Sequence, residues 1–344
     1  MKLSVVFRAG LPASASPYRL LDAHGQEIAW ANTFLDAQSI RQLSPRSLRS
    51  YAYDLLDFAR WSLAEPPHPL AELTQQALLD YVRHQLDQPP PPTPQTINHR
   101  LVVVHCLYRF LYGREIPAGQ CHLLRVYTQR SSLGYGQPRR VLARGLRLQQ
   151  PHRLIRPLSA EEVARFWSSF RTFRDLAIVG LMLLDGLRSC EVLALELADL
   201  HLADAHLYVL GKGRRQRLLP LPQDILTALD RYLHLERPLT NSSSVFVCLK
   251  GPFRGRPLTP AGLRALFRFH RVSSHTALAN PHRFRHTFGA DMVRNGVSLP
   301  ALQQRMGHSQ IRTTMLYIQL APQEVWREYA RAMEKRIHQR PSLP

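Results

Sequence analysis

The fold of this chain is decided by three short motifs near its C-terminal end: PHRFRH at residues 281–286, MGH at 306–308 and TTMLY at 313–317. The last motif ends on Tyr317, whose phenol is a poor nucleophile at neutral pH because its unperturbed pKa is ~10. The preceding motifs supply histidines and arginines that can act as its acid and base partners and can hold a phosphate. The pattern raises the hypothesis of a nucleophilic tyrosine, and a tyrosine packed in a core is the alternative.

The charge balance indicates a polyanionic partner. The 344 residues include 45 Lys and Arg against 25 Asp and Glu, which gives a net charge of +20. No acidic residue occurs in residues 116–160 or 237–290, and both stretches are rich in arginine and histidine. A phosphate backbone, above all that of DNA, can lie along such stretches, although a basic surface that only aids solubility is the simpler alternative. A hydrophobic content of 45% favours a folded protein over a disordered one.

Other features predict a location in the cytoplasm or on the nucleoid. The four cysteines, Cys106, Cys121, Cys190 and Cys248, form no CxxC pair and fit reduced thiols better than disulfides. The apolar run at the N-terminus is too short for a signal peptide. No uninterrupted apolar stretch approaches the ~20 residues of a membrane helix.

The length predicts about two domains, and changes of pattern divide the chain into four parts. Residues 1–32 lack a regular pattern and are expected to form an arm or cap. Residues 33–116 carry helical periodicity and predict a small all-α domain. Residues 117–157 mix Gly, Gln, Pro and Arg without periodicity, which indicates a basic linker or an extended segment that faces DNA. A second domain is expected over residues 158–344.

Helix boundaries follow from caps and breakers. The dipeptide SP at 44–45 predicts a helix start, with Ser as the N-cap and Pro at the first position. Two more helices are expected at about 70–86 and 96–112, separated by a PPPP run. SAEE at 159–162 predicts a capping box that opens the second domain. The apolar segment 174–185 predicts a buried helix.

The period changes at residues 206–221, where LYVL and LLPL flank GKG at 211–213. This predicts a β-hairpin with Lys212 at its tip. A lysine there could reach a ligand and donate a proton, and a solvated turn lysine is the alternative. With the helices, the pattern predicts a mainly α fold with a small β-sheet, of the α+β class.

Two glycines are expected to end helices beside candidate site residues. Gly186 would end the buried helix just before Arg188. Glu191 follows one turn later and can orient a neighbouring cation, although the two residues could also form a simple surface pair. Gly307 would form a left-handed C-cap that directs His308 away from its helix axis.

His282, Arg285 and His286 share one face if residues 282–294 are helical, and Pro281 marks a helix start whose dipole favours anions. The i, i+4 spacing of the two histidines also suits zinc, but the glutamate of HExxH is missing and nearby arginines would repel a cation. Phosphate binding is therefore expected for His282 and Arg285, and mainly a packing role for His286.

Taken together, these residues resemble the tyrosine recombinase (phage integrase) family, whose chemistry is related to that of type IB topoisomerases. The family pattern is an arginine with an acidic residue one turn on, a hairpin lysine, H-x-x-R, G-H and the tyrosine. The sequence has these elements in the same order and spacing: GLR at 186–188 with Glu191, GKG at 211–213 followed by Arg217, HRFRH at 282–286, MGH at 306–308, and Tyr317.

The resemblance is close over about residues 157–335. It is looser over 33–116, which looks like the family's helical, SAM-like core-binding domain. The sequence departs from the pattern at Asp185, where the family often has Thr, and at Ile318-Gln319, which replace a frequent Thr-His. Neither departure touches a reacting group.

The resemblance implies a reaction on double-stranded DNA that needs no metal and no cofactor. Tyr317 would attack the scissile phosphate, forming a 3′-phosphotyrosine and freeing a 5′-hydroxyl, while Arg188 and Arg285 hold the non-bridging oxygens. The other implied roles are proton donation to the leaving oxygen by Lys212, handling of the tyrosine proton by His282 and His308, and positioning by Glu191.

The resemblance further implies a site-specific recombinase or integrase that acts as a homo-tetramer on paired sites, each subunit closing round the duplex as a C-shaped clamp. Residues 322–338 are candidates for a C-terminal helix that docks on a neighbouring subunit or in cis. Two alternatives are a catalytically silent DNA-binding protein and a monomeric topoisomerase; the complete residue set favours the recombinase over the first, and the compact size counts against the second. Contacts to DNA are expected from basic residues of the linker and hairpin: Arg139, Arg140, Arg144, Arg147, Arg214 and Arg215.

Overall fold

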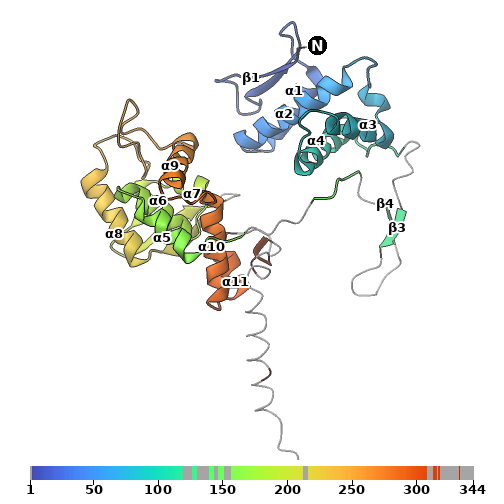
Figure 1. Cartoon of the computed structure of the whole chain (residues 1–344). Helices are drawn as coiled ribbons and strands as arrows, with labels where there is room; N and C mark the ends of the chain where they lie inside the picture. Colours follow the sequence, from blue (N-terminus) through green and yellow to red (C-terminus); the bar gives the residue numbers. More distant parts are fainter. Residues whose placement is uncertain are drawn as a thin grey trace, which may run out of the picture. The chain divides into compact units, whose positions relative to one another are not determined.

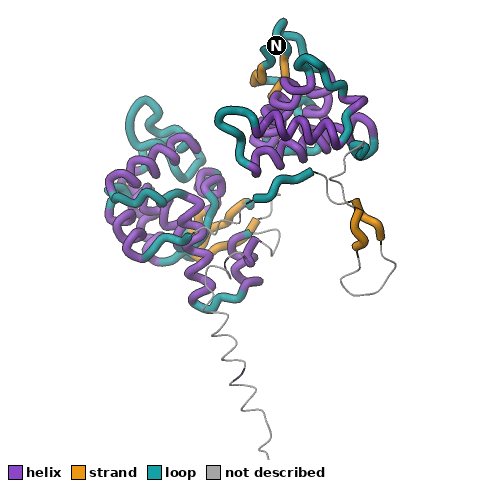
Figure 2. Tube along the Cα trace, turned by 45° about the vertical axis from the view of Figure 1, so that its right-hand side comes forward, coloured by secondary structure: helices purple, strands orange, loops and turns teal. Residues whose placement is uncertain are grey.

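The protein is described from a computed structural model, shown in Figure 1. The structure describes residues 2–118, 126–129, 139–142, 146–150, 156–211, 216–307, 313–315, 317 and 333. The chain divides into two compact units, Met1–His152 and Arg153–Pro344. Each unit has its own hydrophobic core, and helices make up most of both (Figure 2).

The N-terminal unit is a helical domain that begins with a small antiparallel hairpin. Its helix α2 packs against both α1 and α4, and the apolar faces of these helices meet in the core. In chain order the elements are β1 (Ser4–Phe7), β2 (Tyr18–Leu21), α1 (Ala29–Ile40), α2 (Pro45–Ser62), a 3₁₀ turn (Leu70–Glu72), α3 (Gln75–Leu86), α4 (Pro94–Tyr112), and the paired strands β3 (Val126–Gln129) and β4 (Arg139–Leu142).

Residues 1–32, expected as an arm or cap without a regular pattern, contain a short hairpin in their described part. Leu3 and Leu20 of the hairpin are buried in the core of the N-terminal unit. The side chain of Asn32 accepts a hydrogen bond from Leu20 N at 2.8 Å and donates one to Leu20 O at 3.0 Å. These two hydrogen bonds satisfy the backbone N–H and C=O of Leu20, which a further strand would otherwise have to pair. Because Asn32 belongs to α1, they also fix the two four-residue strands to that helix.

The C-terminal unit is built round the buried helix α6, which packs against α8 and α10. A three-stranded antiparallel sheet, in the order β5-β6-β7, adds the only described strands of this unit. The elements are α5 (Ala160–Ser168), α6 (Phe173–Leu183), α7 (Ser189–Leu193), a 3₁₀ turn (Leu197–Asp199), β5 (Leu200–His201), β6 (His206–Leu210), β7 (Gln216–Pro220), α8 (Gln223–Arg231), a π-helical turn (Tyr232–Glu236), α9 (Pro260–Ser273), α10 (Pro281–Arg294) and α11 (Leu299–Met306).

The predicted helix starts are confirmed by their caps. The hydroxyl of Ser44 accepts a hydrogen bond from Ser47 N at 3.2 Å, and Pro45 lies in the first turn of α2. Ser159 and Glu162 form the predicted reciprocal capping box at the start of α5. The predicted hairpin is also present, because β6 and β7 pair with Val209 opposite Arg217. The mainly α fold with small antiparallel sheets is therefore confirmed.

In the part of the chain that the structure describes, no helix has the length and apolar character needed to span a membrane.

We predict that Leu20→Ala destabilises the protein by ~2–5 kcal/mol, because it leaves a cavity in a packed core. Leu11→Ala is the matched control, since Leu11 lies in the same hairpin and is 39% exposed. Urea unfolding followed by circular dichroism measures both free energies of unfolding. Equal, small effects of the two substitutions would show that the hairpin is not part of the core.

Candidate active site

Arg188 and Glu191 are brought together by the turn that follows α6. Gly186 has a positive φ of 67°, a conformation that favours glycine, and the turn places Arg188 as the N-cap of α7. Arg188 donates to Glu191 twice, from its backbone N to Oε2 at 2.9 Å and from Nη1 to Oε1 at 2.7 Å. The Glu191 side chain is only 3% exposed. The alternative of a simple surface pair is therefore wrong.

Arg217, for which the sequence pattern indicates no role, belongs to the same site. From β7 it pairs with the same carboxylate, Nη2 to Oε2 at 2.9 Å and Nη1 to Oε1 at 3.2 Å. Burial alone would raise the pKa of Glu191, but hydrogen bonds and charge from Arg217 and Arg188 outweigh it and lower that pKa. The strand period offered a signal, because Arg217 shares the inward face with the buried Leu219 and a cation there needs a counter-ion.

Arg285 enters the same cluster from the first half of α10. Its side chain is buried; Nη1 donates to Gly186 O, and Nη2 donates to Met306 O at 2.6 Å. Nη1 also lies 3.8 Å from Glu191 Oε2. Burial, and the charge of Arg188, lower the pKa of Arg285 to about 10, so its guanidinium stays charged at neutral pH.

Tyr317 is buried beside these arginines, with 1% of its surface exposed. It belongs to a small core with Phe288, Leu302 and Met306. Its ring lies against Gly289 of α10, where an added Cβ would approach ring atoms Cε1 and Cζ to 2.4 Å. Burial raises the pKa of Tyr317 to about 12, although Arg285 and Arg188 favour the phenolate. The phenol is thus protonated at neutral pH and must lose its proton to react as a nucleophile.

The two histidines of the α10 motif lie in different surroundings. His282 is exposed, whereas His286 is partly buried with its ring centroid 5.8 Å from that of Tyr317. Burial, together with the charges of His282 and Arg285, lowers the pKa of His286 to about 4. His286 is therefore a neutral imidazole that packs on the tyrosine. Among the described residues, no three His, Cys, Asp or Glu side chains gather as metal ligands.

The structure brings Arg188, Glu191, Arg285 and Tyr317 together and leaves His282 at the surface of the same unit. Among the predicted DNA contacts, Arg147 is exposed in the N-terminal unit. Arg139 and Arg140 lie in β4, of which only the backbone is described. The remaining predicted residues lie outside the described part of the chain: Lys212, His308, Arg144, Arg214 and Arg215.

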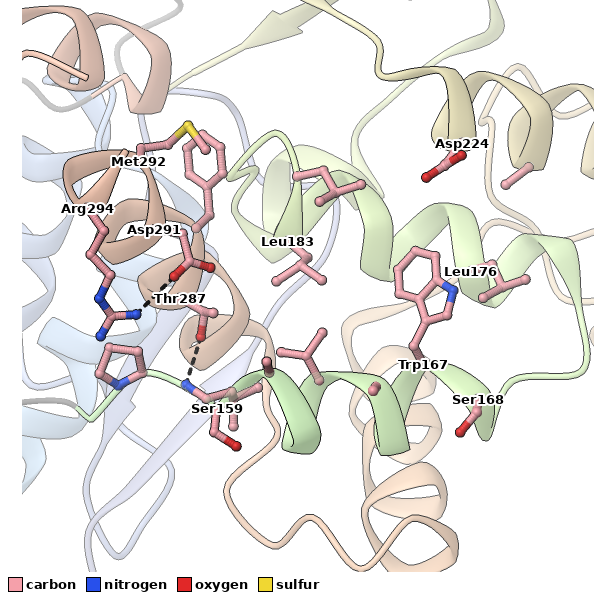
Figure 3. A pocket seen from close by; sticks show the side chains of 18 of the residues that line it. Ser159, Trp167, Ser168, Leu176, Leu183, Asp224, Thr287, Asp291, Met292 and Arg294 are labelled. Atoms are coloured by element: carbon pink, nitrogen blue, oxygen red, sulfur yellow. Dashed lines mark hydrogen bonds and ion pairs between the residues drawn. The ribbon is translucent and has the colours of Figure 1, made fainter. Parts of the chain in front are cut away.

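A separate cavity of about 1130 Å³ lies in the C-terminal unit between α5, α6, α8 and α10 (Figure 3). Its walls are mostly apolar and include Trp167, Leu176, Leu183 and Met292. Two of the lining residues, Arg294 and Asp291, form an ion pair, drawn as a dashed line in Figure 3, with Nη1 and Oδ1 3.0 Å apart. None of Arg188, Glu191, Arg285 or Tyr317 lines this cavity, so it is distinct from the arginine cluster.

Comparisons with known proteins agree with this architecture. Residues 156–324 match the model of the phage integrase family, and residues 32–115 match the model of the phage integrase N-terminal SAM-like domain. The chain is 30% identical over 306 residues to tyrosine recombinase XerC of Chlorobaculum parvum, covering 84% of this chain and 89% of that protein. It is 28% identical to XerC of Alcanivorax borkumensis over 310 residues, 90% of this chain and 94% of the relative.

Solved structures show the same fold at lower identity. XerH site-specific recombinase bound to palindromic difH substrate, in a post-cleavage complex, aligns with a TM-score of 0.62 at 17% identity, covering 88% of this chain and 84% of that one. The Tn1549 transposon integrase with transposon right end DNA aligns with a TM-score of 0.60 at 17% identity, covering 87% and 98%. The class that fold and sequence define is that of the tyrosine recombinases. The chain belongs to the phage integrase family.

We predict that Gly289→Ala slows reaction of the tyrosine with DNA by ~10²-fold, because even ~1 Å of misplacement can cost that much. The change favours the helix by ~1 kcal/mol but overpacks the core at a cost of ~1–3 kcal/mol, so thermal unfolding of the variant is measured to confirm that it is folded at the assay temperature. Single-turnover formation of a covalent protein–DNA adduct measures the rate. Gly262→Ala in α9 is the control, and equal rates for both variants would contradict the prediction.

His286 is expected to titrate near pH 4 rather than at its ordinary value of ~6.5. Because the unfolded chain takes up this proton first, His286 opposes folding as the pH falls from ~6.5 towards 4. NMR of histidine ring carbons measures the midpoint, with His286→Gln assigning the signal. A midpoint between 6 and 7 would contradict the burial that the structure assigns to this ring.

Proposed function

We propose that this chain, a site-specific recombinase by family, cleaves and rejoins DNA through a covalent bond between Tyr317 and a 3′-phosphate. One observation carries the proposal: a buried tyrosine lies beside two arginines, Arg188 and Arg285, that share one carboxylate. A phosphodiester carries one negative charge on two non-bridging oxygens, and charge builds up on them as the fifth bond forms. Two directed guanidiniums can bind those oxygens.

In the proposed cleavage, one bond to phosphorus forms as another breaks, and every proton has a donor and an acceptor. The phenolic oxygen of Tyr317 attacks phosphorus, and the bond from phosphorus to the 5′-oxygen breaks. The phenolic proton passes to a base, for which His282 and His308 are the candidates, and Lys212 supplies a proton to the departing 5′-oxygen. Because one phosphate ester replaces another, the 5′-hydroxyl of a partner strand can reverse the reaction without an energy source. Arg188, Arg285 and Lys212 balance the charge, so the scheme includes no metal and no cofactor.

The assignment of parts is also proposed. Residues 33–116 form the core-binding domain and 158–344 the catalytic domain, with the basic linker 117–157 lying along DNA. Both domains close round the duplex, and four copies act on two paired sites in the cytoplasm, at the nucleoid. XerH and the Tn1549 integrase, whose structures contain their DNA, are precedents for binding at recombination sites. A catalytically silent DNA-binding protein would not need to keep Tyr317 beside the arginines.

Tyr317→Phe is expected to abolish covalent adduct formation while DNA binding is retained, because the ring stays in its core and only the nucleophilic oxygen is lost. The substrate is nicked duplex DNA carrying sites captured from the source genome, and SDS gel electrophoresis detects the adduct. The wild-type reaction is expected to persist in EDTA. An adduct formed by the Phe variant, or a strict requirement of the wild-type reaction for a divalent ion, would contradict the proposal.

A further inference from the structure

The C-terminal end of α11 is a set of acceptors for the arginine cluster. Its last carbonyl groups each receive one guanidinium: Arg217 Nε donates to Arg305 O at 2.9 Å, Arg285 Nη2 to Met306 O at 2.6 Å, and Arg188 Nη2 to Gly307 O at 3.1 Å. Carbonyls at a helix C-terminus lack partners within the helix and carry the negative end of its dipole. Gly307 has φ 63°, which ends the helix at this point.

A buried ion pair holds this helix end in place. Arg305, the residue that offers the first of these carbonyls, also donates from Nη2 to Asp185 Oδ1 at 2.6 Å. Asp185 is fully buried, whereas the Arg305 side chain is 28% exposed. Asp185 directly precedes Gly186, whose carbonyl accepts from Arg285. The pair therefore joins the end of α11 to the turn that places Arg188.

The pair is retained at an energetic cost. Burial raises the pKa of Asp185 to about 7 against the opposing effect of Arg305, so the contact becomes fully ionic only above neutral pH. Asp185 Oδ2 has no hydrogen-bond partner among the described residues. Replacing a buried ion pair by well-packed neutral side chains is often neutral or stabilising.

We propose that Asp185 and Arg305 are positioning residues for the arginine cluster: their ion pair sets the end of α11, whose carbonyls direct the guanidiniums of Arg188, Arg217 and Arg285. Neither residue touches the reacting atoms. The inference rests on the proposed function of the site.

Adduct formation at saturating nicked DNA tests the proposal. Asp185→Asn and Arg305→Gln are each expected to slow it by ~10-fold or more, the scale of misdirecting one preorganised donor, with DNA affinity within ~3-fold of wild type. The double variant should be no slower than the worse single one, because the two residues act as one unit. Arg305→Lys keeps the charge and should restore part of the rate.

The matched control is Asp291→Asn with Arg294→Gln, which removes an exposed ion pair from α10 of the same unit. Its rate should equal that of wild type. If Asp185→Asn fails to fold, Arg305→Gln, at a partly exposed position, carries the test. The proposal would be overturned if both single variants formed the adduct within ~3-fold of the wild-type rate. It would also be overturned if adduct formation fell only in proportion to a loss of thermal stability or of DNA affinity, with the rate at saturating DNA unchanged.

A second readout needs no DNA. The Nε–H of Arg217 donates to Arg305 O, so its NMR signal should shift and exchange faster with solvent in Asp185→Asn than in the control variant. An unchanged signal would also overturn the proposal. If wild-type protein forms no adduct, the proposed function fails, yet this signal still reports whether the ion pair sets the helix end.

Discussion

One buried carboxylate makes the rest of the site possible. Glu191 lies within 4 Å of guanidinium groups from the α6–α7 turn, β7 and α10. Without it, three arginines held this close and largely shielded from water would repel one another strongly. One carboxylate cannot neutralise three cations, so the cluster keeps a positive excess. The proposed function requires a site that attracts a phosphate and also folds in its absence, and this partial compensation meets both requirements.

Burial of Tyr317 has two opposing effects on the reactivity proposed for it. Packing against Gly289 and Phe288 fixes the ring direction, as the proposed role of Tyr317 as nucleophile requires. The same burial raises its pKa to about 12, which holds the phenol in its unreactive form. Arg285 and Arg188 oppose that shift, and a phosphate placed between them would partly cancel this help. In the proposed mechanism, proton removal by a base in step with attack would resolve this conflict, because the phenolate would then never exist as a free, buried anion.

Local signals made much of this structure predictable from sequence. Caps such as Ser44-Pro45 and the box at Ser159 act within one turn, so a short pattern suffices. What escaped prediction depends on partners far apart in sequence. The hairpin of residues 4–21 needs Asn32 and a core from α1 and α2. Arg217 lies 26 residues from its carboxylate, and Arg305 lies 120 residues from Asp185. No local period encodes such pairs, and only the family resemblance had drawn attention to Arg217.

The arginines are therefore held by two kinds of acceptor, a carboxylate and backbone carbonyls, and the difference between them matters for the proposed reaction. A carboxylate removes a full unit of charge, so each further one would weaken the attraction for phosphate. A backbone carbonyl fixes the direction of an N–H group while leaving the guanidinium charge almost intact. The end of α11 supplies such acceptors to Arg188, Arg217 and Arg285 at once. Charge balance is thus assigned to Glu191 and geometry to a helix terminus, and a cluster built this way can be rigid and still bind an anion.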